Sequence, residues 1–288
     1  MSTVAFVGLG EMGGPMADHA IRAGFDVAAF DPRSEAVRAR SEAGGRGCSS
    51  VAEAADGADV VCIVVVDDAQ LLQVVEEASP AASPDAVVVV HSTVSLDALR
   101  RSHRRCADAG IELIDAGISG GGHGAQEGTL TIMAGGEPSA FEAARPVMDA
   151  YGGQIVHLGP LGAGMVAKLA RNLIGYGVMA AAHDGMSLAA GGGVDVAAFR
   201  ALLEETTDTL LLQLAAVIGR PSVEAAPVDP DRHDGIAGLV EIGHKDLFLA
   251  AAAARELGVD LPTVAVAQRR YGPSLGADVP IDDSLQLD

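Results

Sequence analysis

Short runs rich in Val and Ile alternate with Ala-rich segments over about the first 160 residues of the chain. The intervening segments are long enough for helices, and strands that alternate with helices are typical of a parallel sheet with helices on both faces. The sequence therefore predicts an α/β fold for this part of the chain. The strand-like runs are Val4–Gly8, Asp26–Phe30, Asp59–Val66, Ala86–His91 and Glu112–Ile118.

The residues after this alternation follow a different pattern. A glycine cluster at 117–128 predicts a loop, which leads into a further apolar run at Thr129–Ala134. From Gly164 to about Ala190, small and apolar residues recur at helical spacing without a strand pattern, which predicts one long helix. The residues that follow, to about Gly272, are rich in Ala and Leu and are helical in pattern.

A glycine-rich turn joins the first strand-like run to the first predicted helix, which starts near Pro15. The first glycine of such a turn allows a tight bend, the second lets backbone approach a pyrophosphate, and the third lets helix pack on strand. The helix N-terminus then offers free N–H groups to the phosphates. This pattern predicts a dinucleotide-binding domain of Rossmann type. Its cofactor-binding residues would be Gly8, Leu9, Gly10, Met12 and Gly13.

Asp31 ends the second strand-like run. An acidic residue at this place accepts hydrogen bonds from the adenosine ribose hydroxyls and repels a 2′-phosphate. We therefore expect Asp31 to bind the cofactor and the cofactor to be NAD. Arg33, two residues further on, is suited to meet a 2′-phosphate, so NADP stays an alternative.

We place the domain boundary near Gly162. Residues 1–162 are expected to form the dinucleotide-binding domain. Residues 163–288 are expected to form a helical domain for substrate binding and oligomerisation, with residues 163–190 as the connecting helix. Within it, we expect an exposed loop at Gly219–Gly235 and a frayed tail at 278–288.

Composition excludes several classes of function. The chain has 19 Lys and Arg against 39 Asp and Glu, a formal net charge of −20 in 288 residues, which argues against binding to nucleic acid or to an anionic membrane. Its apolar stretches fall short of the roughly 20 residues that span a bilayer. The start lacks a signal-peptide pattern, so a cytoplasmic protein is expected. The three cysteines are expected to be buried free thiols, and no metal-ligand spacing is present, so no metal site is expected.

Five motifs are spread over most of the chain: Gly8–Ala17, Asp115–Gly121, Gly128–Gly136, the stretch from Gly162 through Lys168 to Asn172, and Lys245–Leu247. In this order they resemble the motifs of the β-hydroxyacid dehydrogenases, the group of 3-hydroxyisobutyrate dehydrogenase and tartronate semialdehyde reductase, related to 6-phosphogluconate dehydrogenase. The resemblance implies a Rossmann-type domain, a long connecting helix and an all-helical C-terminal domain. It also implies interconversion of a small 3-hydroxy acid and its semialdehyde or keto acid by hydride transfer with NAD(P).

Carried over residue by residue, the resemblance implies roles for the matching positions around the substrate. Lys168 would be the catalytic acid/base, and Asn172 would bind the substrate. Ser119, Gly120 and Gly121 would hold the substrate carboxylate.

The resemblance also implies residues around the nicotinamide half of the cofactor. Thr93, just after the fourth strand-like run, would lie near the nicotinamide, and Val65 would lie at the cofactor edge. Lys245 would close over the cofactor from the second domain. The chain departs from the family where Gly117 replaces a common proline, which loosens the loop, and where Val64–Val66 replaces a trio that usually includes proline.

The chemistry of hydride transfer suits these residue types. Lys168 and Asn172 are four residues apart and project from one face of the predicted helix. Removal of a hydride from the alcohol carbon leaves a proton on oxygen that an amine can shuttle. Consecutive N–H groups of the glycine-rich 119–122 stretch can point at one anion. His123, in the same loop, is a further candidate for substrate contact.

Two other functions stay open. One is an imine reductase-like enzyme or another reductase on the same scaffold, against which Lys168 counts because that related group usually replaces the catalytic lysine. The other is a non-catalytic nucleotide-binding protein, in which Lys168 and Asn172 would be unneeded. As substrate we expect a small anionic hydroxy acid. A polyol phosphate would want several basic side chains on the far side of the pocket, and the segments expected to shape it, Thr206–Thr209 and Gly219–Gly235, offer only Arg220 and Arg232.

The helical domain is also expected to join subunits. Its segments Leu210–Ile218 and Leu247–Ala254 are apolar almost all round, which is more apolar surface than one compact bundle need bury. We therefore expect a homodimer or homotetramer.

Overall fold

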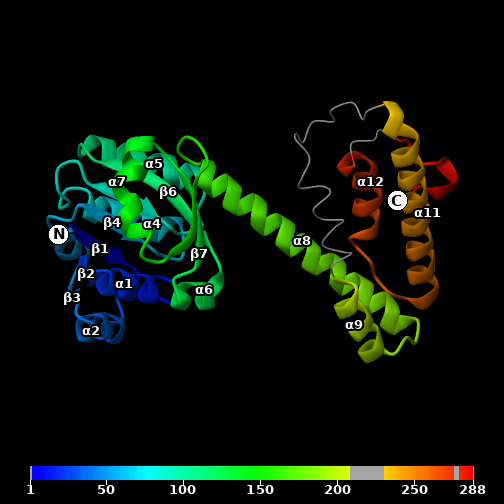
Figure 1. The fold of residues 1–288 in the computed structure, drawn as a ribbon, viewed down its shortest axis with the longest axis horizontal. Coiled ribbons are helices and arrows are strands. Elements are labelled where there is room, and N and C mark those ends of the chain that lie inside the picture. Colours follow the sequence, from blue (N-terminus) through cyan, green and yellow to red (C-terminus); the bar gives the residue numbers. More distant parts are fainter. Residues whose placement is uncertain (1, 208–229, 276–278, 288) are drawn as a thin grey trace. The chain divides into compact units, whose positions relative to one another are not determined.

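The structure is a computed structural model that describes residues 2–207, 230–275 and 279–287. The chain divides into two compact units, Met1–Leu173 and Ile174–Asp288, and the division falls inside the long helix α8 (Ala163–Gly191) (Figure 1). The predicted long helix is thus present. The predicted domain boundary at Gly162 lies directly before its first residue.

One eight-stranded sheet organises the first unit, in the order β3-β2-β1-β4-β5-β6-β7-β8. The neighbouring strands from β3 to β6 pair in parallel, β7 runs antiparallel to β6, and β8 is parallel to β7. The central strands β4 and β5 are buried throughout, as a sheet covered on both faces requires. The strands are β1 (Thr3–Val7), β2 (Asp26–Phe30), β3 (Arg46–Gly47), β4 (Val60–Ile63), β5 (Val87–Val90), β6 (Glu112–Ser119), β7 (Leu130–Gly135) and β8 (Gly152–His157).

Helices cover both faces of this sheet and create two hydrophobic cores. Residues of α1, α6 and α7 pack with Val4 and Phe6 of β1 in one core, and residues of α3, α4 and α5 pack with Ala5 and Val7 in the other. Alternate residues of one strand face opposite sides, so β1 serves both cores. The helices of this unit, besides the start of α8, are α1 (Gly13–Arg22), α2 (Ser34–Glu42), α3 (Val51–Ala55), α4 (Asp68–Ala78), α5 (Leu96–Asp108), α6 (Gly121–Glu127) and α7 (Pro138–Met148).

The predicted α/β alternation is confirmed, because each predicted strand-like run contains a strand. The glycine cluster at 117–128, however, is not a loop: β6 continues to Ser119, and α6 follows at once. Gly128 ends α6 in the left-handed conformation (φ 68°), which favours glycine. The ring of His19 donates from Nε2 to the carbonyl oxygen of Gln126 at 2.9 Å, which ties α6 to α1. Tertiary contact therefore holds a helix that its glycine-rich sequence disfavours.

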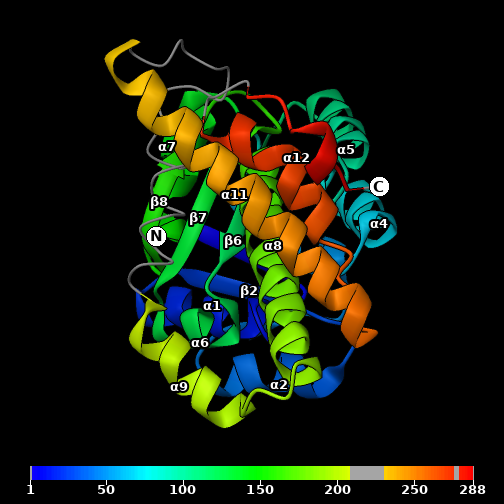
Figure 2. The same cartoon turned by 90° about the vertical axis from the view of Figure 1, so that its right-hand side faces the viewer.

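The second unit is helical in the part that the structure describes. It contains most of α8, α9 (Val196–Glu205), α11 (Pro230–Leu257), α12 (Val264–Ser274) and a short 3₁₀ helix (Asp283–Leu285). Helices α11 and α12 lie side by side (Figure 2). Asp184 of α8 accepts hydrogen bonds from the Thr263 N–H at 3.0 Å and the Thr263 hydroxyl at 2.6 Å, which joins α8 to the start of α12.

Two expectations for this half of the chain are corrected. The loop predicted at Gly219–Gly235 is helical from Pro230 onward, where a proline in the first helical turn costs no hydrogen bond. The rest of that loop and the apolar segment Leu210–Ile218 lie outside the described residues. The acidic tail does not fray between 279 and 287, because Gln268 of α12 donates to the Leu285 carbonyl at 2.8 Å and accepts from the Leu287 N–H at 3.2 Å.

The three cysteines are buried free thiols, as predicted. Burial raises the pKa of Cys62 to about 12 and that of Cys106 to about 11, and it also raises the pKa of Cys48. Across the described ranges, none of the helices has the length and apolar character needed to cross a membrane.

Candidate active site

The turn between β1 and α1 has the geometry of a dinucleotide cradle. Gly8 adopts φ 93°, and a Cβ there would collide with the carbonyl oxygen of Val64. A Cβ on Gly13 would collide with the carbonyl oxygen of Gly8. Space around Gly10 is open, since the nearest atom to a Cβ built there is an Arg33 nitrogen at 3.9 Å. The turn therefore needs its first and third glycines for packing and leaves the second free for a ligand to approach.

Asp31 is held in place at the end of β2, next to this turn. Its Oδ2 accepts from the Leu9 N–H at 2.8 Å, and its Oδ1 accepts from the Arg33 N–H at 2.9 Å. The Arg33 side chain donates to both carboxylate oxygens. Burial disfavours the charged carboxylate, but the bonds from Arg33 and from the Leu9 N–H outweigh it and hold the pKa of Asp31 below its ordinary value. Asp31 is thus an anion fixed between the turn and a guanidinium.

The ends of β4 and β5 form the next part of this edge. Val65 is half-buried and Thr93 is exposed. The buried hydroxyl of Ser92 accepts from the Val65 N–H at 2.7 Å, which joins the loop after β4 to the loop after β5. Ser92 was not among the residues predicted from the sequence. A polar residue directly after the strand-like run 86–91 was the available signal.

Ser119 ends β6 with its side chain buried, and the two following glycines turn the chain into α6. Gly120 has φ 130° and Gly121 has φ 62°, and both values favour glycine. A Cβ on Gly121 would meet no atom within 4 Å, so its backbone is accessible. His123 is exposed on α6.

Lys168 and Asn172 lie half-buried on α8, within the first unit. The aliphatic part of Lys168 lies against β6, because a Cβ built on Gly117 would be 2.9 Å from the Lys168 Cβ. Burial lowers the pKa of Lys168, and the positive charge of Arg171 lowers it further. Both effects disfavour the ammonium form, so the surroundings of Lys168 favour the neutral amine more than water does.

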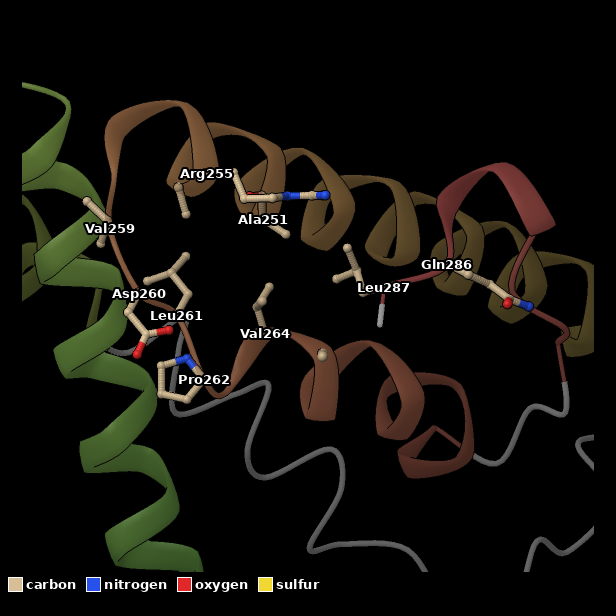
Figure 3. Close-up of a pocket in the computed structure, with 11 residues that line it drawn as sticks. Ala251, Arg255, Val259, Asp260, Leu261, Pro262, Val264, Gln286 and Leu287 are labelled. Carbon is tan, nitrogen blue, oxygen red and sulfur yellow. The ribbon is translucent and has the colours of Figure 1, made fainter.

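The remaining predicted residue, Lys245, lies on α11 in the second unit. It is exposed, and its Nζ is 3.2 Å from the Asp246 Oδ1. The second unit also contains a pocket of about 360 Å³ between α11, α12 and the C-terminal tail, lined by Arg255, Asp260, Gln286 and apolar side chains (Figure 3). None of the predicted site residues lines this pocket.

The first unit therefore brings most of the predicted site residues to one edge of the sheet. The glycine turn, Asp31, Val65, Thr93 and Ser119 all follow the carboxyl ends of parallel strands, the edge at which open α/β sheets bind ligands. Among the described residues, no group of three or more His, Cys, Asp and Glu is arranged to hold a metal ion.

Comparison with known proteins gives the family. Residues 3–159, more than half of the chain, match the model of the NAD binding domain of 6-phosphogluconate dehydrogenase. A 3-hydroxyisobutyrate dehydrogenase from Pseudomonas aeruginosa is 31% identical over 290 residues, which cover 96% of this chain and 94% of that protein. The chain belongs to the β-hydroxyacid dehydrogenase family. The protein is accordingly an oxidoreductase with an NAD-binding domain, and the glycine turn and Asp31 fit that cofactor.

Two further likenesses bear on the substrate of this family member. An NAD-dependent L-serine dehydrogenase from the same Pseudomonas species is 32% identical over 284 residues, which cover 94% of this chain and 91% of that protein. An imine reductase of known structure from a Pseudomonas species has a TM-score of 0.76 at 21% identity and covers 93% of this chain and 91% of that one. The second likeness shows a shared fold alone.

Proposed function

We propose that the protein oxidises a small 3-hydroxy acid to its semialdehyde or keto acid with NAD, or catalyses the reverse reduction, with Lys168 as the acid/base. The observation that carries this proposal is the place of Lys168: its stem lies on Gly117 of β6, two residues before Ser119, and its pKa is lowered by burial. An amine with a lowered pKa can exchange a proton near neutral pH more readily than a solvated lysine.

Residues at the carboxyl edge of the sheet would bind the cofactor. The N–H groups of the Gly8–Gly13 turn would hold the pyrophosphate of NAD, and Asp31 would accept from the adenosine ribose hydroxyls. NAD supplies the acceptor for the hydride when it is bound. Val65 and Thr93 would border the nicotinamide.

The substrate side would be built from β6 and α8. The Ser119 hydroxyl and the N–H groups of Gly120 and Gly121 would donate to the substrate carboxylate, and Asn172 would orient the substrate. As the hydride leaves the alcohol carbon, the neutral amine of Lys168 would take the proton from the alcohol oxygen. In the reduction the Lys168 ammonium would return that proton to the carbonyl oxygen. Lys245, from the second unit, would contact the cofactor.

A small anionic hydroxy acid is the substrate class that we favour. Serine is itself a 3-hydroxy acid, and the relative named for L-serine supports a substrate of this size. The choice between a hydroxyisobutyrate-like, a glycerate-like and a serine-like acid needs direct assay. We place the reaction in the cytoplasm.

A panel of 3-hydroxy acids, each with NAD and with NADP, tests the proposal through the absorbance of the reduced nicotinamide. The panel includes a cyclic imine with NADH and with NADPH, because an imine reductase has the same fold. Turnover of a hydroxy acid and not of the imine is expected. Reduction of the imine alone would reject the proposal, and cofactor binding without turnover of any compound would favour a non-catalytic nucleotide-binding protein.

We also propose that two or more copies associate through α8. Val166, Leu169 and Leu173 follow helical spacing on the part of α8 that belongs to the first unit and are 51%, 43% and 74% exposed. Apolar side chains in such a stripe are typical of a surface that another chain covers. A homodimer or homotetramer would bury this stripe.

A further inference from the structure

A buried carboxylate joins β6 to the first turn of α8. Asp115 is fully buried, and its Oδ1 accepts from the Gly162 N–H at 2.6 Å while its Oδ2 accepts from the Met165 N–H at 2.5 Å. The first N–H groups of a helix have no partner within the helix, and a negative charge at this end is favourable. Asp115 is therefore the partner of the α8 N-terminus.

Two glycines, Gly135 and Gly164, make room for this carboxylate, because a side chain at either would collide with it. A Cβ on Gly135 would be 2.8 Å from Oδ1, and a Cβ on Gly164 would be 2.9 Å from Oδ2. Burial raises the pKa of Asp115, and the backbone N–H groups that it binds oppose this rise. Hydrogen bonds that involve a charged acceptor are about twice as strong as neutral ones, so the Asp115 carboxylate holds the start of α8 more strongly than a neutral acceptor would.

The same face of β6 reaches Lys168. Asp115, Gly117 and Ser119 alternate along the strand and so point to one side of the sheet. Asp115 binds the first turn of α8, and Gly117 contacts the stem of Lys168. Ser119 ends the strand at the place proposed for the substrate carboxylate. Along one face of β6, Asp115 therefore contacts the start of α8, Gly117 contacts Lys168, and Ser119 lies where the substrate carboxylate is proposed to bind.

We infer that Asp115 is a positioning residue for the reaction: together with Gly117 it fixes the rotation and height of α8 on β6, so that the amine of Lys168 meets the alcohol oxygen of a substrate whose carboxylate is held at Ser119. This inference rests on the proposed role of Lys168. Asp115 acts through the helix and does not itself contact the substrate. A displacement of about 1 Å at a reacting group is enough to cost about 10²-fold in rate.

The chain offers a matched control for a buried carboxylate at a helix start. Asp184 accepts from the backbone N–H and the hydroxyl of Thr263, the residue before α12, just as Asp115 accepts from the start of α8. Asp184 is also a residue of α8, but the helix start that it binds carries none of the residues proposed to react. Asp184→Asn therefore reports the cost of losing such a bond without a change at Lys168.

The experiment is a double-mutant cycle with Asp115→Asn, Lys168→Ala and the double variant, and with Asp184→Asn in parallel. The amide nitrogen that Asp115→Asn introduces cannot accept, so one of the two helix N–H groups loses its partner. Turnover is expressed per NAD-binding site, so that unfolded protein does not count. We expect Asp115→Asn to lower kcat by about 10²-fold with unchanged affinity for NAD. The double variant should be no slower than Lys168→Ala alone, because a residue that acts through Lys168 has nothing left to position.

Each outcome decides between the two proposals. Effects of Asp115→Asn and Lys168→Ala that multiply, or a loss of kcat in Asp184→Asn equal to that in Asp115→Asn, would overturn the positioning role. Near wild-type turnover by Lys168→Ala would instead reject the proposed acid/base. If Asp115→Asn does not fold, Gly117→Ala decides, because its Cβ would lie 2.9 Å from the Lys168 Cβ and so displaces the Lys168 stem while Asp115 itself stays unsubstituted. Normal kcat in Gly117→Ala would then overturn the inference.

Discussion

The guanidinium of Arg33 donates hydrogen bonds to both carboxylate oxygens of Asp31, from Nε to Oδ1 at 2.9 Å and from Nη2 to Oδ2 at 3.1 Å. Asp31 is only 7% exposed, whereas Arg33 is 56% exposed. The carboxylate that would meet the adenosine ribose is therefore partly neutralised by a cation that solvent and ligands can reach. This pairing bears directly on the choice between NAD and NADP.

Asp31→Asn should weaken binding of NAD and improve binding of NADP relative to it. The substitution removes a charge that repels a 2′-phosphate and leaves Arg33 free to bind one. We expect a change in the ratio of kcat/KM for the two cofactors of about tenfold or more, equivalent to about 1.4 kcal/mol or more. Asp26→Asn, at the exposed start of the same strand, is the control and should leave the ratio unchanged. A wild-type preference for NADP would show that Arg33 outweighs Asp31.

Lys168→Ala should lower kcat by about 10²- to 10⁴-fold, the range for loss of a general acid/base. Affinity for NAD should barely change, because the glycine turn and Asp31 hold the nucleotide. Lys168→Arg should rescue poorly, since a guanidinium keeps the charge but does not deprotonate. Should the arginine variant oxidise the hydroxy acid at near wild-type rate, Lys168 only anchors charge, and His123 becomes the first candidate for the acid/base.

The rate of oxidation should rise with pH through a midpoint below the ordinary pKa of lysine. Burial and Arg171 lower the pKa of Lys168, and the oxidation needs its neutral form. The reduction needs the ammonium, so its rate should fall through the same midpoint. Profiles of kcat/KM in both directions measure this. Profiles that run parallel, rather than opposite, would contradict a single lysine in both roles.

Acid should destabilise the first unit through His91. Its ring is buried, with Nδ1 2.8 Å from the Ala116 carbonyl oxygen and Nε2 3.0 Å from the Tyr151 hydroxyl, and burial lowers its pKa to about 4. The unfolded chain binds a proton near pH 6.5 and the folded chain does not, so this stability is present above pH 6.5 and is lost as the pH falls toward 4. The loss amounts to about 3 kcal/mol for the pKa difference.

Urea unfolding between about pH 7 and about pH 4.5 measures this effect. His91→Gln keeps a neutral donor and acceptor in the core, so its free energy of unfolding should fall less with acid than that of the wild type. His103→Gln, at a half-buried histidine on α5, serves as the control and should follow the wild type. Equal slopes for His91→Gln and the wild type would reject the assignment.

Association through α8 should fail when a charge enters its apolar stripe. Leu173→Glu places a carboxylate in the stripe formed with Val166 and Leu169. Light scattering at micromolar concentration should show an oligomer for the wild type and a smaller species for the variant. A wild-type monomer under these conditions contradicts the proposed assembly.

Patterns that depend on neighbours in the sequence were enough to predict much of the first unit. Alternating Val-rich and Ala-rich segments located β1, β2, β4, β5 and β6, because a parallel sheet buries its strands on both faces. They missed β3, which has two residues, and β8, which begins with two glycines and has no fully buried residue. The helix α6 was missed because its stability comes from contact with α1.

In the candidate site too, the roles that depend on local sequence could be predicted, and those that depend on tertiary contacts could not. The glycine turn and Asp31 could be predicted from local spacing alone, because their roles depend on one strand, one turn and one helix. Asp115 stands in one of the five motifs, but nothing in the sequence indicates its role. Its role depends on Gly162 and Met165, which are distant from it in the sequence and meet it only in the folded chain.

The buried thiols make native protein and unfolded protein chemically distinguishable. Only the thiolate attacks alkylating and disulfide reagents, and at pKa values of about 12 for Cys62 and about 11 for Cys106 almost none of it exists at neutral pH. Unfolding returns these thiols to water and to an ordinary pKa, so they become reactive only in molecules that have opened. The rate at which a thiol reagent modifies Cys62 and Cys106 therefore reports how often the sheet opens, and no cysteine has to be introduced for the measurement.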